Sequence, residues 1–262
     1  MNSCIKSLLF VPAKDKMLAK IPLLNANAYI IDLEDSIPEE EKEDALNRTI
    51  HFIDNCDSTF NIIVRINSNR VEFELTKLSK YSKIGFMLPK YEKDNPYDEF
   101  EEIIRNHYAI ALIETPKAIV DLNSISKIKY INALAFGAED YTAKANMENN
   151  VDFLYFQKSM LVTYAKANNL QAFDTPSFNL NNECEFEKEV QNAVGLGFDG
   201  KMAISPKHVP FINEAFSYND LDYMKSIISR YEADENAVVV IDDKVYEKMH
   251  INRLKKIISE NS

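Results

Sequence analysis

The chain has 262 residues and a formal net charge of −11, from 30 basic and 41 acidic residues. This length suits one large domain or two small ones, and 46% hydrophobic residues suffice for a sizeable core. The negative charge argues against binding to nucleic acid or to an anionic membrane. It does not exclude an anionic small molecule, because a few local cations can bind one.

The cysteine pattern and the lack of long apolar segments both bear on where in the cell the protein is expected. Cys4, Cys56 and Cys184 are odd in number and lack a metal-like spacing, so they are typical of reduced thiols. The first residues contain no long apolar segment, and no later run is long enough to span a membrane. We therefore expect a cytoplasmic protein.

Short apolar runs recur along the chain and predict buried strands. Charged amphipathic stretches, such as residues 38–55 and 115–125, separate most of them and predict helices. This alternation predicts an α/β fold, a (β/α)8 TIM barrel. The runs cover residues 7–11, 28–33, 61–66, 84–88, 108–113, 133–136, 170–173 and 200–204.

The chain changes character after the eighth run. We expect an acidic linker around Asp220–Asp222, a helix over 224–231, a strand-like run at 238–241 and a basic amphipathic helix over 247–259. The predicted domains are a barrel over residues 1–218 and a C-terminal arm or lid over 219–262. The arm is expected to pack on a neighbouring subunit. Alternatively, it only covers the flank of its own barrel.

Two of the apolar runs end in an acidic residue. The run 108–113 leads into Glu114, and the run 133–136 leads through Gly137 into Glu139 and Asp140. If both strands are parallel in one sheet, Glu114 and Asp140 lie on the same rim, where a barrel forms its active site. Two carboxylates with room for water and substrate are what Mg²⁺ prefers. We therefore predict a metal site at this pair.

Other charged residues follow the remaining strands, and burial of so many charges argues for a polar reaction site. Arg65 is the candidate to hold a substrate carboxylate or to stabilise an oxyanion. The alternative for Arg65 is a salt bridge to Asp32, Glu34 or Asp35. The turn at Glu139–Asp140 offers backbone N–H groups to a substrate carboxylate.

Several common chemistries lack support in this sequence. It contains no nucleophile elbow, no P-loop and no dinucleotide-binding glycine motif. Schiff-base chemistry would need a desolvated lysine, for which Lys90 and Lys201 are the candidates. The chain has only five glycines, and we expect them where close backbone approach or a positive φ requires glycine, with codon bias as the alternative.

Taken together, eight segments resemble the citrate lyase β-subunit family, within the aldolase group that includes malyl-CoA and citramalyl-CoA lyases. The resemblance implies a TIM barrel, a homotrimer or hexamer, Mg²⁺ held by Glu114 and Asp140, and substrate contacts from Arg65 and the backbone at Glu139–Asp140. The matching segments run in the family's order and cover residues 7–12, 32–35, 64–67, 88–90, 113–115, 136–140, 174–176 and 197–201.

The reaction that the resemblance implies is reversible carbon–carbon cleavage of a 3-hydroxy-acyl thioester, such as citramalyl-CoA, malyl-CoA or a citryl thioester. The products are an acyl thioester and a 2-oxo acid. Lys6, Lys14 and Lys20 are the candidates to meet phosphates of the thioester carrier. Two rivals remain open: an aldolase acting on a free hydroxy-oxo acid, and a degenerate barrel that serves as a binding or assembly subunit.

The sequence departs from the family pattern at three positions. Ala13 replaces a usual glycine after the first strand, and Ser205 replaces a usual histidine near the end of the barrel. In the C-terminal arm, Glu247 stands where coenzyme A-using members carry an aspartate that enters a neighbour's site. We expect Glu247 to act as the proton-transferring acid, although its extra methylene shifts the carboxylate.

Overall fold

The computed structural model describes residues 5–57, 59–150, 152–217, 221–234 and 236–261. The chain forms two compact units, Met1–Asn213 and Glu214–Ser262, and each is described by itself below. The predicted boundary between residues 218 and 219, like Asp220 of the predicted linker, lies outside the described residues. Cys4 lies outside them too.

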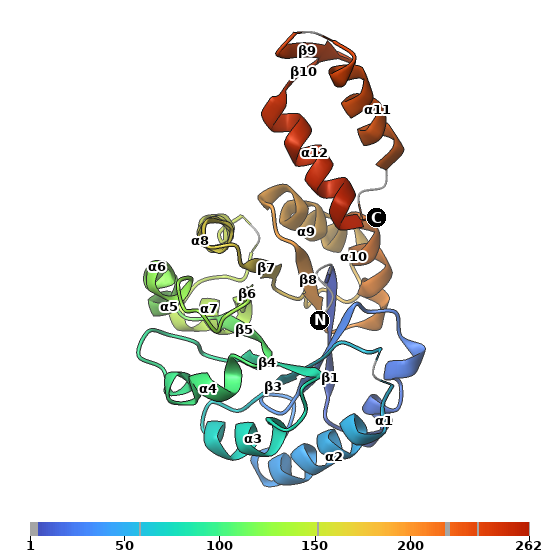
Figure 1. Cartoon of the computed structure of the whole chain (residues 1–262). Helices are drawn as coiled ribbons and strands as arrows, with labels where there is room; N and C mark the ends of the chain where they lie inside the picture. The colour runs from blue at the N-terminus through green and yellow to red at the C-terminus, as the bar shows by residue number, and fades with distance from the viewer. Residues whose placement is uncertain (1–4, 58, 151, 218–220, 235, 262) are drawn as a thin grey trace. The chain divides into compact units, whose positions relative to one another are not determined.

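The first unit is a closed barrel of eight parallel strands, in which β1 pairs with β8, so the predicted TIM barrel is confirmed (Figure 1). Each predicted apolar run coincides with one strand to within one residue at either end. The strands are β1 (Ser7–Pro12), β2 (Ala28–Asp32), β3 (Ile62–Arg65), β4 (Ile84–Leu88), β5 (Tyr108–Ile113), β6 (Ala133–Phe136), β7 (Gln171–Asp174) and β8 (Gly200–Ala203).

The barrel interior is filled by alternate side chains of the strands. Ile30, Ile63, Ile110, Phe173 and Met202 belong to this interior cluster and are buried. Successive strand residues point to opposite faces, so the residues between them face the surrounding helices, and most of these outward residues are apolar too. This explains why continuous apolar runs marked the strands.

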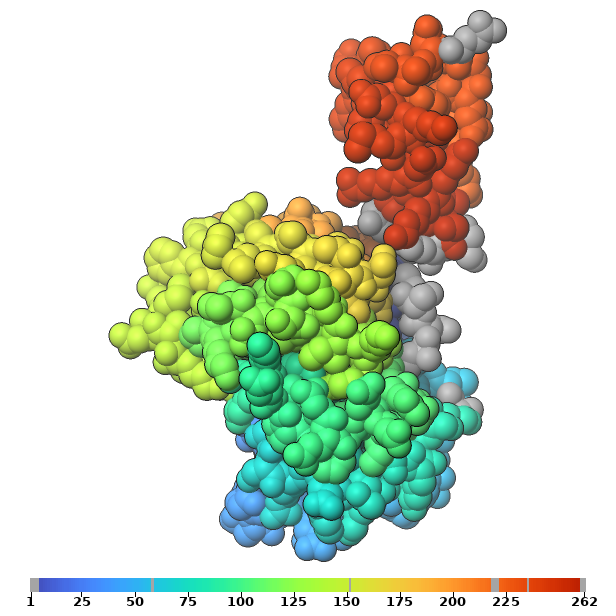
Figure 2. All heavy atoms as spheres, turned by 60° about the vertical axis from the view of Figure 1, so that its left-hand side comes forward, coloured from blue at the N-terminus to red at the C-terminus, as the bar shows by residue number. Residues whose placement is uncertain are grey.

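Helices cover the outside of the barrel, and Figure 2 shows the side formed by the green to yellow segments. Asp121 divides the predicted helix 115–125 into α5 and α6. The α-helices are α1 (Asp15–Leu18), α2 (Lys42–Asn55), α3 (Val71–Leu78), α4 (Glu101–Ile104), α5 (Pro116–Val120), α6 (Leu122–Ile125), α7 (Ala138–Ala145), α8 (Tyr155–Ala167), α9 (Glu183–Leu196) and α10 (Val209–Ala215), and the 3₁₀ helices are η1 (Ile21–Leu23), η2 (Glu39–Glu41), η3 (Pro96–Phe100) and η4 (Pro206–His208).

The second unit contains α11 (Leu221–Glu232), an antiparallel hairpin of β9 (Val238–Ile241) and β10 (Lys244–Glu247), and α12 (Lys248–Asn261). Ile227, Ile241 and Ile251 form its small core. The hairpin turn places Asp242 and Asp243 at positive φ, as tight hairpin turns require. The helix predicted roughly over 247–259 is present as α12, which begins one residue later at Lys248 because Glu247 pairs with Val238 as the last residue of β10. Within the described ranges, no helix combines the length and apolar character needed to cross a membrane.

Candidate active site

A cavity of about 360 Å³ opens at the carboxyl ends of the barrel strands. Its wall combines carboxylates and Arg65 with apolar side chains from the barrel interior and from the rim. The lining residues are Phe10, Pro12, Asp32, Asp35, Ser36, Arg65, Leu112, Glu114, Gly137, Ala138, Glu139, Asp140, Thr175, Pro176, Phe178, Met202 and Ile204. The predicted pair Glu114 and Asp140 therefore lies at one cavity, together with Arg65 and Glu139.

Glu114 is buried and tightly enclosed at the end of β5. Its Oε1 accepts a hydrogen bond of 2.6 Å from the backbone N–H of Lys90. On its other side lies Gly137, where an added Cβ would stand 2.7 Å from the Glu114 Cβ and 2.8 Å from Oε2. Only glycine leaves room for this carboxylate, so the close approach expected of a glycine occurs here.

Asp140 lies half-buried in the first turn of α7 and faces the same cavity. Burial, together with the negative charges of Asp140 and Glu34, raises the pKa of Glu114 to about 8. A divalent cation between these carboxylates would offset that repulsion. No third His, Cys, Asp or Glu of the described residues joins them in a metal-binding group. Two carboxylates with open positions suit Mg²⁺, which keeps water ligands.

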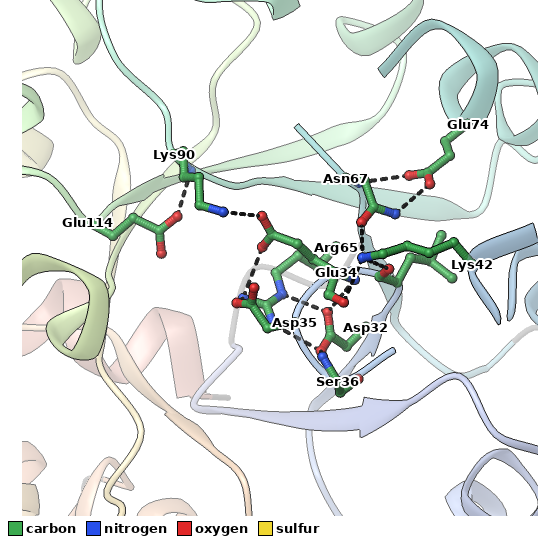
Figure 3. A network of polar contacts seen from close by, with 11 residues as sticks. Asp32, Glu34, Asp35, Ser36, Lys42, Arg65, Asn67, Glu74, Lys90 and Glu114 are labelled. Carbon is green, nitrogen blue, oxygen red and sulfur yellow. Dashed lines mark hydrogen bonds and ion pairs between the residues drawn. The ribbon is translucent and has the colours of Figure 1, made fainter. Parts of the chain in front are cut away.

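Arg65 is the centre of a network of charges at the cavity (Figure 3). Its Nε and Nη2 bind the two carboxylate oxygens of Asp32 at 2.7 and 2.9 Å. Its Nη1 lies 3.0 Å from Asp35 and 3.3 Å from Glu34. Burial alone would raise the pKa of Asp32, but the bonds to Arg65 outweigh this effect and lower it. The alternative predicted for Arg65, a salt bridge to these acids, is therefore present, although Arg65 also lines the cavity.

Residues 6–206 match the family described as HpcH/HpaI aldolase/citrate lyase. The chain belongs to this family. The resemblance to citrate lyase β-subunits that the motifs predicted is confirmed.

Among curated relatives of this HpcH/HpaI chain, citrate lyase subunit beta of Haemophilus influenzae is 29% identical, over 97% of this chain and 95% of its own length. Mitochondrial citramalyl-CoA lyase of Rattus norvegicus is 27% identical, over 81% of this chain and 71% of its own length. Both proteins carry the names of lyases, which supports the predicted enzyme class.

A solved structure has the same fold over the whole chain. It is CitE from Mycobacterium tuberculosis in complex with magnesium, acetoacetate and coenzyme A, with a TM-score of 0.81 and 20% sequence identity. The similarity covers 100% of this chain and 99% of the solved one. At this identity the comparison supports the barrel fold alone, so the chemistry of the site is argued from its own residues.

Lys90, a Schiff-base candidate, and Glu34, a possible partner of Arg65, were not expected to bind each other or to reach Glu114, but the structure links all three. Lys90 adopts a positive φ of 51°, and its Nζ donates a 2.9 Å hydrogen bond to Glu34. Lys90 therefore joins the two carboxylates, through its backbone to Glu114 and through its side chain to Glu34 (Figure 3). No pattern in the sequence indicates that Lys90, directly after Pro89, adopts a positive φ. We call Asp32, Glu34, Arg65 and Lys90 the cavity network.

A second charged cluster, the wall network of Lys158, Asp174, Glu189 and Lys201, lies outside the barrel. Asp174 binds Lys201 at 2.7 Å and Lys158 at 2.9 Å, and none of the three side chains is more than 3% exposed. Phe173 and Met202 point into the barrel, so their neighbours Asp174 and Lys201 point outward, toward α8 and α9. Charged residues at the strand ends were expected to form a polar site at the rim, but Asp174, at the end of β7, does not line the cavity, and neither does Lys201.

The remaining predicted residues of the first unit do not line the cavity. Lys6 precedes β1, at the amino end of the strand, so the prediction that it meets the substrate's carrier is not supported by its position. Lys14 and Lys20 are exposed on either side of α1, after the carboxyl end of β1. Glu247 is exposed in the second unit, where its N–H contacts the ring of His250.

Two of the departures from the family pattern have visible structural roles. Ala13 is buried directly after β1, and its carbonyl oxygen accepts a 2.9 Å bond from Arg48. The hydroxyl of Ser205 accepts a bond of 3.3 Å from the backbone of Lys207 and so caps η4.

Proposed function

We propose that this protein is a Mg²⁺-dependent carbon–carbon lyase, which cleaves or forms a 3-hydroxy-acyl thioester from an acyl thioester and a 2-oxo acid. The observation that carries this proposal is the pairing of Glu114 and Asp140 at one cavity that Arg65 also lines. Membership of the aldolase/citrate lyase family supports it. The names of the relatives point to citryl and citramalyl thioesters as the first substrates to test.

The carboxylates of Glu114 and Asp140 would hold Mg²⁺ in this site. When bound, the ion supplies Lewis-acid polarisation to the carbonyl of a 2-oxo acid. The raised pKa of Glu114, about 8, means that Glu114 must lose its proton before it serves as a ligand. The site should therefore bind the ion more tightly as the pH rises toward that value.

The chain's other cavity residues have separate tasks in this proposal. The guanidinium of Arg65 faces the oxygen on which charge develops as the carbon–carbon bond breaks. The carboxylate of Asp32 accepts hydrogen bonds from Nε and Nη2 of Arg65 and so fixes the plane of the guanidinium. The N–H groups of Glu139 and Asp140 receive the substrate carboxylate at the start of α7.

The cavity also suits the acyl part of the substrate. Its apolar lining includes Phe10, Leu112, Met202 and Ile204, whereas its charged groups lie on Asp32, Arg65, Glu114 and Asp140. A volume of about 360 Å³ is near the lower end of the range for small-molecule sites, so we expect a short acyl group.

Purified protein with Mg²⁺ should release a 2-oxo acid and an acyl-CoA from citramalyl-CoA or malyl-CoA, as measured by coupled reduction of the 2-oxo acid and by chromatography of the thioesters. Chelation of the metal should abolish the release. Cleavage of a free 4-hydroxy-2-oxo acid in place of the thioesters would favour the rival aldolase. Absence of both Mg²⁺ binding and cleavage would favour the binding or assembly subunit.

The finer expectations extend this proposal beyond the single chain. We propose a cytoplasmic homotrimer or hexamer in which Glu247 of a neighbour's arm transfers a proton, and Lys14 and Lys20 meet the carrier phosphates. Light scattering measures the assembly. Glu247→Gln should lower kcat more than it changes KM, whereas an unchanged kcat would leave Glu247 without a role in proton transfer.

A further inference from the structure

We infer that Thr175 is a positioning residue for Asp140, because its hydroxyl replaces the missing cap of α7 from a neighbouring strand end. This inference rests on the proposed function and adds to it a residue that contacts neither the metal nor the reacting atoms. Thr175 follows β7, whereas Asp140 lies in the helix that follows β6. The two segments meet at the cavity, which Thr175 also lines.

The first step is that α7, which follows β6, has no side-chain cap of its own, whereas the helices α5 and α9 that follow the adjacent strands β5 and β7 have one. Thr115 caps α5 and Asn182 caps α9, each through its own side chain. The residue at the start of α7 is Gly137, which has no side chain to accept a bond. Capping side chains satisfy N–H groups of the first turn and contribute about 1 kcal/mol to helix stability.

The second step is that the active site itself prevents a capping residue at position 137. Any capping side chain begins with a Cβ, which would stand 2.7 Å from the Glu114 Cβ and 2.8 Å from its Oε2. Side-chain atoms essentially never approach this closely. The space for the Glu114 carboxylate therefore excludes a cap from within the chain segment of α7.

The third step is the replacement of that cap. The Thr175 hydroxyl accepts a hydrogen bond of 3.2 Å from the backbone N–H of Ala138, the first residue of α7. An ordinary cap would instead accept from the second or third residue of the helix, which are Glu139 and Asp140. Among the described residues, no acceptor contacts the N–H groups of Glu139 or Asp140. Capping by Thr175 thus steadies the turn and leaves these two donors for the substrate.

The fourth step is that Thr175 is itself held in place. It is buried, and its carbonyl oxygen accepts a 2.7 Å bond from Lys201 of the wall network. Lys201 is in turn bound to Asp174, the residue before Thr175. The buried charges outside the barrel therefore anchor the loop from which Thr175 reaches α7.

The test compares Thr175→Val, which keeps the shape but cannot accept the bond, with Thr175→Ser, which can. Thr163→Val, an exposed position on α8, is the matched control. In Thr175→Val we expect Mg²⁺ affinity, measured by calorimetry, to fall about 10- to 100-fold, as for other groups that orient metal ligands. Thr175→Ser and Thr163→Val should bind Mg²⁺ as the wild type does. Hydrogen exchange at residues 138–141 should quicken in Thr175→Val alone.

An unchanged Mg²⁺ affinity in Thr175→Val would overturn the inference, whatever the exchange result. An equal loss in Thr175→Ser would overturn it as well, because the hydroxyl would then not be the group that matters. Failure of the wild type to bind Mg²⁺ would instead overturn the proposed function. In that case, unchanged exchange at residues 138–141 in Thr175→Val would separately refute the cap.

Discussion

The cavity network and the wall network both pair carboxylates with cations around strands of the same barrel, yet they lie on opposite sides of its wall, and the wall network takes Lys158 and Glu189 from α8 and α9. In the cavity network, Arg65 and Asp32 point inward, and the side chain of Lys90 is 39% exposed. In the wall network, both oxygens of Asp174 are bound by lysines, and neither Asp174 nor Lys201 is exposed to solvent at all. Arg65 and Asp32 therefore line a cavity that a ligand can enter, whereas Asp174 and Lys201 are enclosed by protein groups.

The direction in which a strand residue points therefore decides whether its buried charge can contact a ligand. A charge that points inward at the carboxyl end of a strand meets the cavity, where metal or substrate can complete its partners. A charge that points outward meets the helix layer, where only protein groups can pair with it. We therefore expect changes in the wall network to affect stability and changes at the cavity to affect chemistry.

The largest effect should follow removal of Asp174. Asp174→Ala leaves Lys158 and Lys201 buried without their shared partner, and loss of one partner from a buried ion pair costs about 3–5 kcal/mol. Urea denaturation measures this loss. Asp35→Ala is the control, because Asp35 is a 57% exposed partner of Arg65 and should change stability by less than about 1 kcal/mol. Equal losses in the two variants would remove the distinction between the networks.

The next effect concerns the space beside Glu114. Gly137→Ala should displace the Glu114 carboxylate and lower the lyase rate about 100-fold, since a shift of about 1 Å can cost that much. Gly195→Ala is the matched control, because an added Cβ there has no atom within 4 Å. This second variant should keep full activity and gain up to about 1 kcal/mol in α9. Steady-state kinetics at saturating Mg²⁺ would contradict this account if both variants were equally active.

The smallest of these effects is a pH dependence of folding stability that arises from Glu74, at the edge of the cavity network. Glu74 is buried against Asn67, which Lys42 also contacts, and burial raises its pKa to about 7. The folded state thus holds this proton more tightly than the unfolded chain does, so Glu74 favours folding at low pH and loses that contribution as the pH rises through about 7.

Glu74→Gln should remove this dependence. Relative to the variant, the wild type should lose about 2 kcal/mol of unfolding free energy between pH 5 and pH 8. Denaturant melts across this range provide the comparison. Parallel pH profiles for the two proteins would show that Glu74 does not titrate differently on folding.

The strands and the placement of Glu114 and Asp140 at one cavity were predictable because both depend on local patterns. Each strand is buried on both faces, so each appears as a continuous apolar run, and the acids that follow fall on one rim. Which residues of each strand point into the barrel was not predictable in the same way, because a strand that is apolar on both faces shows no alternation of apolar and polar residues. Asp174 was therefore expected at the rim, although its side chain points outward.

The contacts of the site that the sequence did not predict join segments that are distant along the chain. Lys90 reaches Glu34 across 56 positions of the chain, and Thr175 reaches Ala138 across 37. Neither residue lies in a periodic pattern, and Lys90 adopts its positive φ without being glycine or asparagine. Gly137 did carry a signal, because a chain with only five glycines keeps one two residues before Glu139.

The central claim is that Glu114 and Asp140 together hold Mg²⁺ in an intact barrel. Its most direct test is calorimetric titration of Mg²⁺ into the wild type, Glu114→Gln and Asp140→Asn, at a pH above the Glu114 pKa of about 8. We predict binding to the wild type and no measurable binding to either variant, while circular dichroism shows both variants folded. Unchanged Mg²⁺ affinity in both folded variants would contradict the account.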